Sequence, residues 1–261
     1  MNLDNWKEKI FKIEKKPRQE IASMPNESPR ERYKSSPQEV ILDSRDFERE
    51  GELLGGRIGD ARFVKIRDDW GGVFKPHSNY EGQRKKAFIS RERAAYLISR
   101  FLGFDFVPPT VIKIINGKEG SLQEFVEDAK SGYETGYSDI DQDERVKLEI
   151  FDNLIVNEDR HGNNYLVKDG KIFAIDHGYS LDPIDLGKNI YIERVPVGIA
   201  EKLRRFVESE DQKGILRDLL VELLGESVAD KFIKRVVAFV ESTNADLVFD
   251  ENKFSNLMGG Y

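Results

Sequence analysis

The polar loop and hairpin over residues 153–180 constrain the fold more than any other part of this sequence. The loop holds Asp159, His161 and Asn164, and two short apolar runs follow it, separated by Lys-Asp-Gly-Lys. An Asp-Gly pair between two such runs is typical of a β-hairpin with a two-residue turn. Because a hairpin brings the chain back to where it started, Asp176, after the second run, is predicted to lie beside Asn164.

This arrangement of side chains suits phosphoryl transfer. Mg²⁺ binds hard oxygen ligands and keeps several waters, so one carboxylate and one amide oxygen beside a triphosphate can hold it. In kinases these ligands are an Asp after a strand and an Asn of the catalytic loop, and another loop Asp orients the attacking hydroxyl. Asp176, Asn164 and Asp159 fit these roles in that order. A solvated turn followed by an ordinary strand end is the alternative interpretation.

These motifs resemble a known family. D-R-H-x-x-N followed by I-D-x-G is similar to the phosphatidylinositol 3-/4-kinase superfamily of atypical kinases, and most closely to its small prokaryotic members. Protein kinases in the strict sense carry H-R-D, the reverse of the order found here at residues 159–161. HipA-type kinases are more distantly similar. The resemblance covers residues 51–181, which include V-F-K-P, V-P-P-T-V and G-S-L-Q-x-F-V.

The resemblance implies an α+β, two-lobed protein-kinase-like fold that uses ATP and Mg²⁺. We expect a small antiparallel-sheet N-lobe with one main helix over residues 39–128, and a mostly helical C-lobe over residues 129–261. Residues 1–38 are expected to add a short amphipathic helix over 1–14 and then a proline-rich polar arm.

Two charged residues of the expected N-lobe are candidates for phosphate binding. Lys75 lies inside an apolar strand over 72–76, where an unpaired ammonium would be costly. The resemblance implies that Lys75 binds the phosphates and that Glu92 is its partner. Ser90 is predicted to cap a helix that follows a mobile basic loop over 77–87. The alternatives are a surface lysine, and a glutamate that favours the positive end of its helix.

Two further segments are candidates for nucleotide contact. Gly55 and Gly56 lie in a glycine-rich turn where backbone amides could approach phosphate, although a plain hairpin turn fits equally well. The resemblance implies that a strand over 121–126 runs into the hinge and lines the adenine pocket. The residues concerned are Gln123, Glu124, Phe125 and Val126.

The catalytic base is left open between two residues of the loop. His161 could accept a proton near neutral pH. Asp159 is favoured as the polar contact to the nucleophile, because the loose transition state needs little early proton abstraction. His177, which replaces the Phe of D-F-G, is predicted to be a packing ring. Arg160 is predicted to bond loop carbonyls or a nearby carboxylate.

Apolar periodicity predicts the helices of the C-lobe. A helix over 141–155 delivers the catalytic loop, and residues 178–200 form a short activation segment. The last few residues are expected to fray. The three later helices are predicted over 199–208, 211–224 and 227–242.

Composition narrows the class of protein. The 261 residues carry 41 basic and 48 acidic side chains, and the net charge of −7 excludes a general nucleic-acid binder. The absence of cysteine excludes disulfides and thiolate metal sites. Without a long apolar run or a signal-peptide core, we expect a cytoplasmic protein without membrane insertion.

The hydroxyl acceptor is not identified by the sequence. A protein Ser/Thr, including one of this chain itself, is compatible with the motifs, and so is a small molecule or lipid headgroup. The run Arg84-Lys85-Lys86 is too short to recognise anionic lipid. The alternatives are a nucleotide-binding pseudokinase, an enzyme that transfers AMP on the same fold, and an unrelated α/β protein with a coincidental motif.

Overall fold

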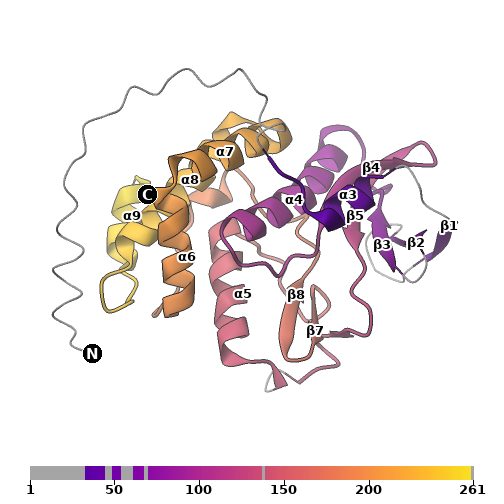
Figure 1. Ribbon diagram of the computed structural model, residues 1–261. Helices are drawn as coiled ribbons and strands as arrows, with labels where there is room; N and C mark the ends of the chain where they lie inside the picture. The colour runs from indigo at the N-terminus through magenta and orange to yellow at the C-terminus, as the bar shows by residue number, and fades with distance from the viewer. Residues whose placement is uncertain (1–32, 45–48, 54–60, 68–69, 137–138, 260–261) are drawn as a thin grey trace.

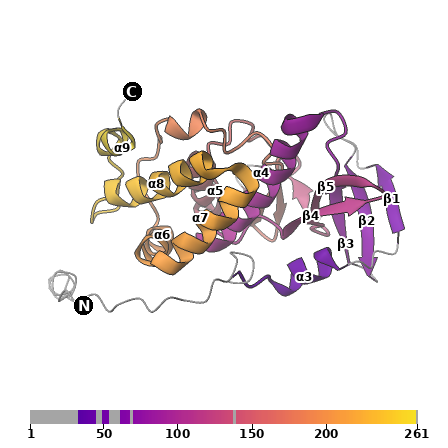
Figure 2. The same ribbon diagram turned by 90° about the horizontal axis from the view of Figure 1, so that it is seen from above.

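The computed structural model describes five stretches of the chain, which are residues 33–44, 49–53, 61–67, 70–136 and 139–259. They form a sheet at one end of the molecule and a group of helices at the other, with the long helix α4 (Gly82–Phe101) between them (Figure 1). The view from above shows the same division (Figure 2). The helix predicted over 1–14, and the candidate residues Gly55 and Gly56, lie outside the described residues.

The larger sheet is built from β1 (Arg49–Leu53), β2 (Arg62–Arg67), β3 (Trp70–Lys75), β4 (Thr110–Ile115) and β5 (Lys118–Glu124). The strands pair antiparallel in the order β1-β2-β3-β5-β4, so β3 is central and brings Lys75 to its end. Asn116 and Gly117 join β4 to β5 with φ of 51° and 76°. These left-handed values are those of a two-residue hairpin turn.

Helix α3 (Pro37–Asp43) begins inside the stretch predicted as a polar arm. Ser36 caps it, because its side chain accepts from the Glu39 amide while the Glu39 carboxylate accepts from the Ser36 amide. This reciprocal pair is a capping box, and Pro37 suits the first helical position. The signature Ser-Pro-x-Glu was therefore present in the sequence, but the surrounding prolines and charges concealed it.

Helix α4 begins at Gly82, eight residues before the predicted cap at Ser90, so that prediction is wrong. Residues 82–87 are helical and not a mobile loop. The physical reason is that Gln, Arg, Lys and Ala are strong helix formers. The charges of Arg and Lys do not disfavour a helix face that is exposed to water. Ser90 is instead buried in the helix interior, and Glu92 lies well beyond the first turn. The predicted helix end is confirmed, because Gly103 follows it with a φ of 70°.

The rest of the chain is mostly helical, as predicted. The hairpin of β7 and β8 is confirmed, with Asp169 and Gly170 at φ of 51° and 74° in its turn. It pairs with the short β6, which was not predicted. The elements are β6 (Lys130–Ser131), α5 (Gln142–Ile155), β7 (Tyr165–Lys168), β8 (Lys171–Ala174), η2 (Asp185–Gly187), α6 (Val197–Glu208), α7 (Glu210–Leu224), α8 (Glu226–Ser242) and α9 (Glu251–Met258).

Helix α9 was not predicted from the sequence. Asp250 caps it, because its carboxylate accepts from the Lys253 amide at 3.0 Å. Phe254 is fully buried and holds the helix against α8. Met258, predicted to be frayed, is the last residue of the helix.

The apolar core has two parts of unequal size. A small cluster under the sheet contains Leu42, Phe74 and Leu122. A much larger cluster joins α5, the β7–β8 hairpin and α6 to α9, and it also takes in residues 94–98 of α4. In the sequence, helix α4 therefore lies between two strands of the sheet, but its apolar residues pack in the core of the helical part. No helix in the described part of the chain is long and apolar enough to cross a membrane.

Arg235 of α8 fastens the segment after the hairpin to α5. Its side chain is almost completely buried, and its guanidinium donates to the carbonyl oxygens of Asn153, Leu186 and Lys188. Without a carboxylate among these acceptors, burial lowers the pKa of Arg235 to about 10, which still leaves it charged at neutral pH. The guanidinium also lies 5.1 Å from the centre of the Phe254 ring.

We predict that Arg235→Met lowers the free energy of unfolding by about 2–4 kcal/mol, because one buried carbonyl and two partly buried ones lose their donor. The change is measured as a lower urea midpoint by circular dichroism. Arg217→Met is the matched control, since Arg217 is a half-buried arginine that pairs with the exposed carboxylates of Asp230 and Glu226. Exposed ion pairs contribute little, so its midpoint should stay near that of the wild type. Equal midpoints for the two variants would contradict the prediction.

Candidate active site

Lys75 points inward from the end of β3 and meets two carboxylates. Its Nζ lies 2.9 Å from Oε1 of Glu92 and 3.6 Å from Oδ1 of Asp176. The Lys75 side chain is 16% exposed and that of Glu92 only 2%, whereas Asp176 is 45% exposed. The structure thus excludes a surface lysine, and it places the pair between the sheet and the hairpin.

Lys75 and Glu92 hold each other in their ionised forms. Burial acts against the charge of Lys75, but the carboxylates of Asp176 and Glu92 outweigh it and raise the pKa of the ammonium. Burial likewise opposes the charge of Glu92, yet Lys75 and the adjoining His177 lower the pKa of the carboxyl well below its usual range. At neutral pH the cluster therefore presents a lysine cation next to a partly open aspartate.

Asp176 follows β8 in a backbone conformation that is uncommon for a residue with a side chain. Its φ is 61°, in the left-handed region, which Asp tolerates better than most residues. Sparsely populated conformations of this kind cluster at functional sites. The amide of Ile175 donates to the Asn164 carbonyl at 3.1 Å, so the two ends of the hairpin meet as the turn predicted.

Asn164 is oriented by Asp159. The Asn164 side-chain nitrogen donates to the backbone carbonyl of Asp159 at 2.7 Å and to its carboxylate at 3.3 Å. Asn164 is nearly buried, whereas the side chain of Asp159 is 45% exposed. Since the amide nitrogen is bonded to Asp159, the amide oxygen is the Asn164 atom left for a cation.

Arg160 connects the loop to the core below it. Its guanidinium binds both oxygens of Asp152 at 2.8 and 2.9 Å and donates to the Ile175 carbonyl at 2.8 Å, as well as to the Asn164 carbonyl. It also lies 3.0 Å from Nε2 of His177. The prediction that Arg160 bonds carbonyls and a carboxylate is confirmed.

His177 is a fully buried ring, as predicted for the position of the D-F-G phenylalanine. Arg160 can only donate, so Nε2 of His177 accepts and the proton lies on Nδ1. Burial lowers the pKa of His177, which keeps the ring neutral. Its backbone amide donates to Oε2 of Glu92 at 3.1 Å. His177 therefore fixes the second oxygen of the carboxylate that holds Lys75.

His161 lies on the exposed side of the loop. Its Nδ1 accepts from the Asn163 amide at 3.2 Å, and its Nε2 lies 4.0 Å from the Asp159 carboxylate. The ring stacks on Tyr133, with centroids 6.3 Å apart. Both candidates for the base thus face the same open region, and the choice between Asp159 and His161 stays a prediction.

The strand predicted over 121–126 ends at Glu124. The Gln123 side chain is buried and donates to the Thr110 hydroxyl at 2.9 Å, and Glu124 accepts from the Trp70 indole at 2.9 Å. These side chains are bonded within the sheet, and the Glu124 amide also donates to the Pro109 carbonyl at 2.8 Å. Phe125 is partly exposed and packs edge-on against Phe63. The adenine-pocket roles of Gln123, Glu124, Phe125 and Val126 remain predictions.

Sequence reasoning missed Arg91, which links α4 to the segment after Asp176. Its guanidinium donates to the Gly178 carbonyl at 3.2 Å and pairs with Asp182 at 3.2 Å. Nearby, the hydroxyls of Tyr80 and Tyr179 lie 3.0 Å apart. No local pattern distinguishes Arg91 from the charged residues around it, so only the fold reveals this contact.

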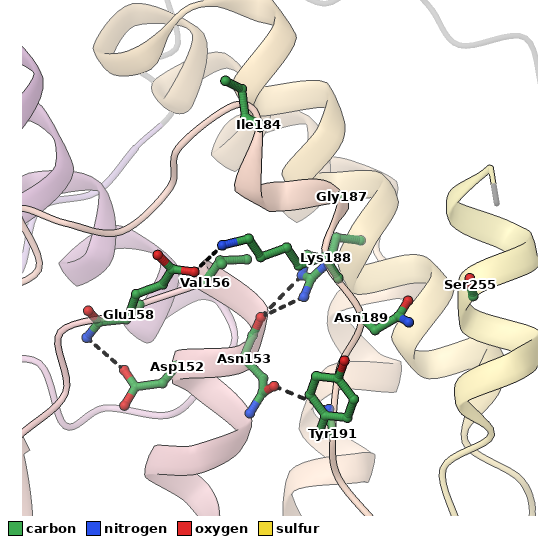
Figure 3. Close-up of a pocket in the computed structure, with 12 residues that line it drawn as sticks. Asp152, Asn153, Val156, Glu158, Ile184, Gly187, Lys188, Asn189, Tyr191 and Ser255 are labelled. Atoms are coloured by element: carbon green, nitrogen blue, oxygen red, sulfur yellow. Dashed lines mark hydrogen bonds and ion pairs between the residues drawn. The ribbon is translucent and has the colours of Figure 1, made fainter. Parts of the chain in front are cut away.

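A cavity of about 590 Å³ lies between the end of α5 and residues 184–191, with Glu158 in its wall (Figure 3). Lys188 pairs there with Glu158 and, at 2.9 Å, with Asp185. The amide of Tyr191 donates to the Asn153 side chain at 3.4 Å. Ile184 and Tyr191 are 82% and 71% exposed at its edge. In the sequence, the signal that could have indicated this cavity was the pair of large residues Ile184 and Tyr191 in a loop bounded by prolines.

The described residues contain no group of three His, Cys, Asp or Glu side chains that could hold a metal ion. The donors that do fit Mg²⁺ are the carboxylate of Asp176 and the amide oxygen of Asn164. Two protein oxygens suffice where phosphate and water complete the coordination.

Comparison with known proteins agrees with the resemblance. The chain is 34% identical over 134 residues to phosphatidylinositol 4-kinase gamma 4 of Arabidopsis thaliana, covering 40% of this chain and 24% of that protein. It is 39% identical over 159 residues to phosphatidylinositol 4-kinase gamma 3 of the same plant, covering 45% and 28%. The chain therefore spans about a quarter of the length of these curated relatives.

The solved structure of hydra Fam20 with sugar is similar in fold, with a TM-score of 0.51, 15% identity, and coverage of 76% of this chain and 84% of that one. Together with the observed sheet and helices, this likeness confirms the predicted two-lobed, kinase-like α+β fold. The family model for phosphatidylinositol 3- and 4-kinase matches residues 91–233, which is more than half of the chain. This protein belongs to the phosphatidylinositol 3- and 4-kinase family.

Proposed function

We propose that this protein is a kinase that uses ATP and Mg²⁺ to transfer the γ-phosphoryl group to a hydroxyl. The observation that carries the proposal is the position of Lys75, whose ammonium lies between a buried carboxylate and a partly open one. The buried partner, Glu92, orients the lysine. The open partner, Asp176, faces the region where a phosphate and a cation would meet.

Lys75 supplies a fixed positive charge for the phosphates. Its pKa is raised, so the amine stays protonated throughout the neutral range. Asp176 and Asn164 would hold Mg²⁺ through a carboxylate and an amide oxygen. The metal, when bound, offsets the negative charge of the triphosphate. Asp159 keeps Asn164 in the required orientation through the bonds to its side-chain nitrogen.

Asp159 also addresses the acceptor hydroxyl. In the reaction, the hydroxyl oxygen forms a bond to the γ-phosphorus while the bond to the bridging oxygen breaks and ADP leaves. The hydroxyl proton passes to Asp159 or to His161, which lies 4.0 Å from the Asp159 carboxylate. A loose transition state requires mainly that the hydroxyl is aligned. The exposed carboxylate of Asp159 can do this by accepting a hydrogen bond from the hydroxyl.

We further propose that the acceptor is a protein Ser or Thr. The relatives are named for phosphatidylinositol, but the residues around the cavity beside Glu158 are poorly suited to a polyanionic headgroup. Of its lining residues, Lys188 and Arg235 are the cations, and both are bonded to oxygens of the protein. Exposed Ile184 and Tyr191 at the edge suit a polypeptide instead. The net charge of −7 favours a neutral or basic one.

We predict that the wild-type protein transfers labelled phosphate from ATP, and that Asp176→Ala lowers kcat/KM by about 100-fold or more, because a positioned charge is lost. The measurement is the rate of label transfer to protein or ADP release. Asp211→Ala, an exposed aspartate in the first turn of α7, is the control and should retain activity. Equal rates for Asp176→Ala and the wild type would remove the basis of the proposal.

Magnesium binding is tested separately from turnover by thermal unfolding. ATP with Mg²⁺ should raise Tm, and a ligand at about 100 times its Kd stabilises by about 2.7 kcal/mol. The rise in Tm with ATP and Mg²⁺ is compared with the rise with ATP alone. In Asn164→Ala and Asp176→Ala, we expect the additional rise in Tm due to Mg²⁺ to be lost. Glu158→Gln, changed one residue before the loop Asp, should keep it. An increment that is the same in all four proteins would exclude this pair as metal ligands.

The mass of the product decides what is transferred and to which acceptor. We expect a single phosphate increment on a Ser or Thr of this chain or of an added basic protein, and none on vesicles that contain phosphatidylinositol. A whole-nucleotide increment would instead show AMP transfer. Labelled lipid without labelled protein would overturn the protein acceptor while leaving the kinase reaction intact.

A further inference from the structure

Glu39 is a buried carboxylate outside the part of the chain that the family model matches. It is 1% exposed, and its Oε1 lies 2.7 Å from the Arg93 guanidinium. Its Oε2 accepts from Arg100 at 2.7 Å, from the hydroxyls of Tyr33 and Tyr96 at 2.8 and 2.9 Å, and from the Ser36 amide at 2.8 Å. One side chain thus gathers two arginines and two tyrosines.

Three of these partners lie on one face of α4. Arg93, Tyr96 and Arg100 are spaced i, i+3 and i+7, which places them in a row over two helical turns. A carboxylate that binds the whole row sets both the rotation of the helix about its axis and its position along that axis. Burial would by itself raise the pKa of Glu39, but Arg93 and the bonds from Ser36 and Tyr33 lower it, so the carboxylate is an anion at neutral pH.

The same turn of α4 carries the catalytic contact. Glu92 binds Lys75, and its neighbour Arg93 binds Glu39 and the carbonyl of Thr110, the first residue of β4. Successive residues of a helix point about 100° apart, so one turn meets both the site and α3. A shift of Arg93 therefore moves Glu92 with it.

Helix α3 is in turn fastened to the sheet that carries Lys75. Leu42 is fully buried in the cluster under the sheet, and Lys113 of β4 donates to the Leu42 carbonyl at 2.8 Å. The capping box with Ser36 also fixes the position of Glu39, which is the residue that binds α4. Both partners of the Lys75–Glu92 pair are thus connected through the segment 33–44.

We infer that Glu39 is a positioning residue, which sets α4 so that Glu92 meets Lys75. The inference rests on the proposed function for its consequence in catalysis, but the geometry it concerns exists without nucleotide. Replacing Glu39 removes the anion between Arg93 and Arg100, and the two cations then repel each other. Helix α4 stays packed on α7 through its apolar face, so the fold persists while the turn at residues 91–93 loosens.

The test measures the reactivity of the Lys75 amine without ATP, followed by kinetics. In wild type, Lys75 should acylate slowly with an amine-selective reagent compared with the exposed Lys118 of the same chain. In Glu39→Gln we expect the Lys75-to-Lys118 ratio to rise about fivefold, the lower end of coupling between linked sites. The kinetic expectation is a lower kcat and a higher KM for ATP, with the KM for the acceptor unchanged. Glu39→Asp should restore part of both effects.

Glu144→Gln is the matched control, a half-buried carboxylate on α5 that accepts from the Ile172 amide at 3.2 Å and pairs with Lys147 at 3.1 Å. It should leave the Lys75 ratio unchanged. Tyr96→Phe, which removes one donor and no charge, gives a milder variant should Glu39→Gln fail to fold, and it should shift the ratio in the same direction. A ratio unmoved in the folded variants would overturn the inference. A raised ratio in a protein that transfers no phosphate would support it and overturn the proposed function instead.

Discussion

The ion pair of Lys75 and Glu92 is the contact around which the candidate site is built. It joins the end of a central strand to the interior of a helix, and both side chains are largely withdrawn from water. A buried pair of this kind contributes little to stability compared with apolar residues of the same size, because desolvation offsets the attraction. Folding alone therefore does not explain the pair, whereas the proposed function does, because it uses the charge of Lys75 to bind phosphate.

The surroundings of the pair are arranged to keep it in one geometry. His177 donates its backbone amide to the second oxygen of Glu92, and Arg160 fixes the His177 ring from the other side. Arg160 in turn binds the carbonyls at the start and end of the hairpin. Lys75, Glu92 and the loop that holds Asn164 thus share one network.

The parts of this site that were predictable are those whose pattern is local. The Asp-Gly turn defines the hairpin, and the hairpin places Asp176 near Asn164 without any knowledge of the remaining fold. Lys75 stood out because an apolar strand surrounds it. Ser90 was misassigned because a polar residue before an apolar run looks like a cap, although the helix formers upstream continue the helix. Glu39 and Arg91 were missed because their partners lie far away in the chain, and no local period encodes such contacts.

Helix α4 explains why these distant contacts matter for chemistry. It carries Glu92 toward the sheet, but its apolar residues 94–98 are packed in the core of the helical part. A motion between the sheet and the helices therefore tends to separate Lys75 from Glu92, because each partner follows a different core. The contact between Glu39 and Arg93 crosses this division and opposes that separation. Under the proposed function, Lys75 would therefore present its charge to a phosphate only while both cores keep one relative position.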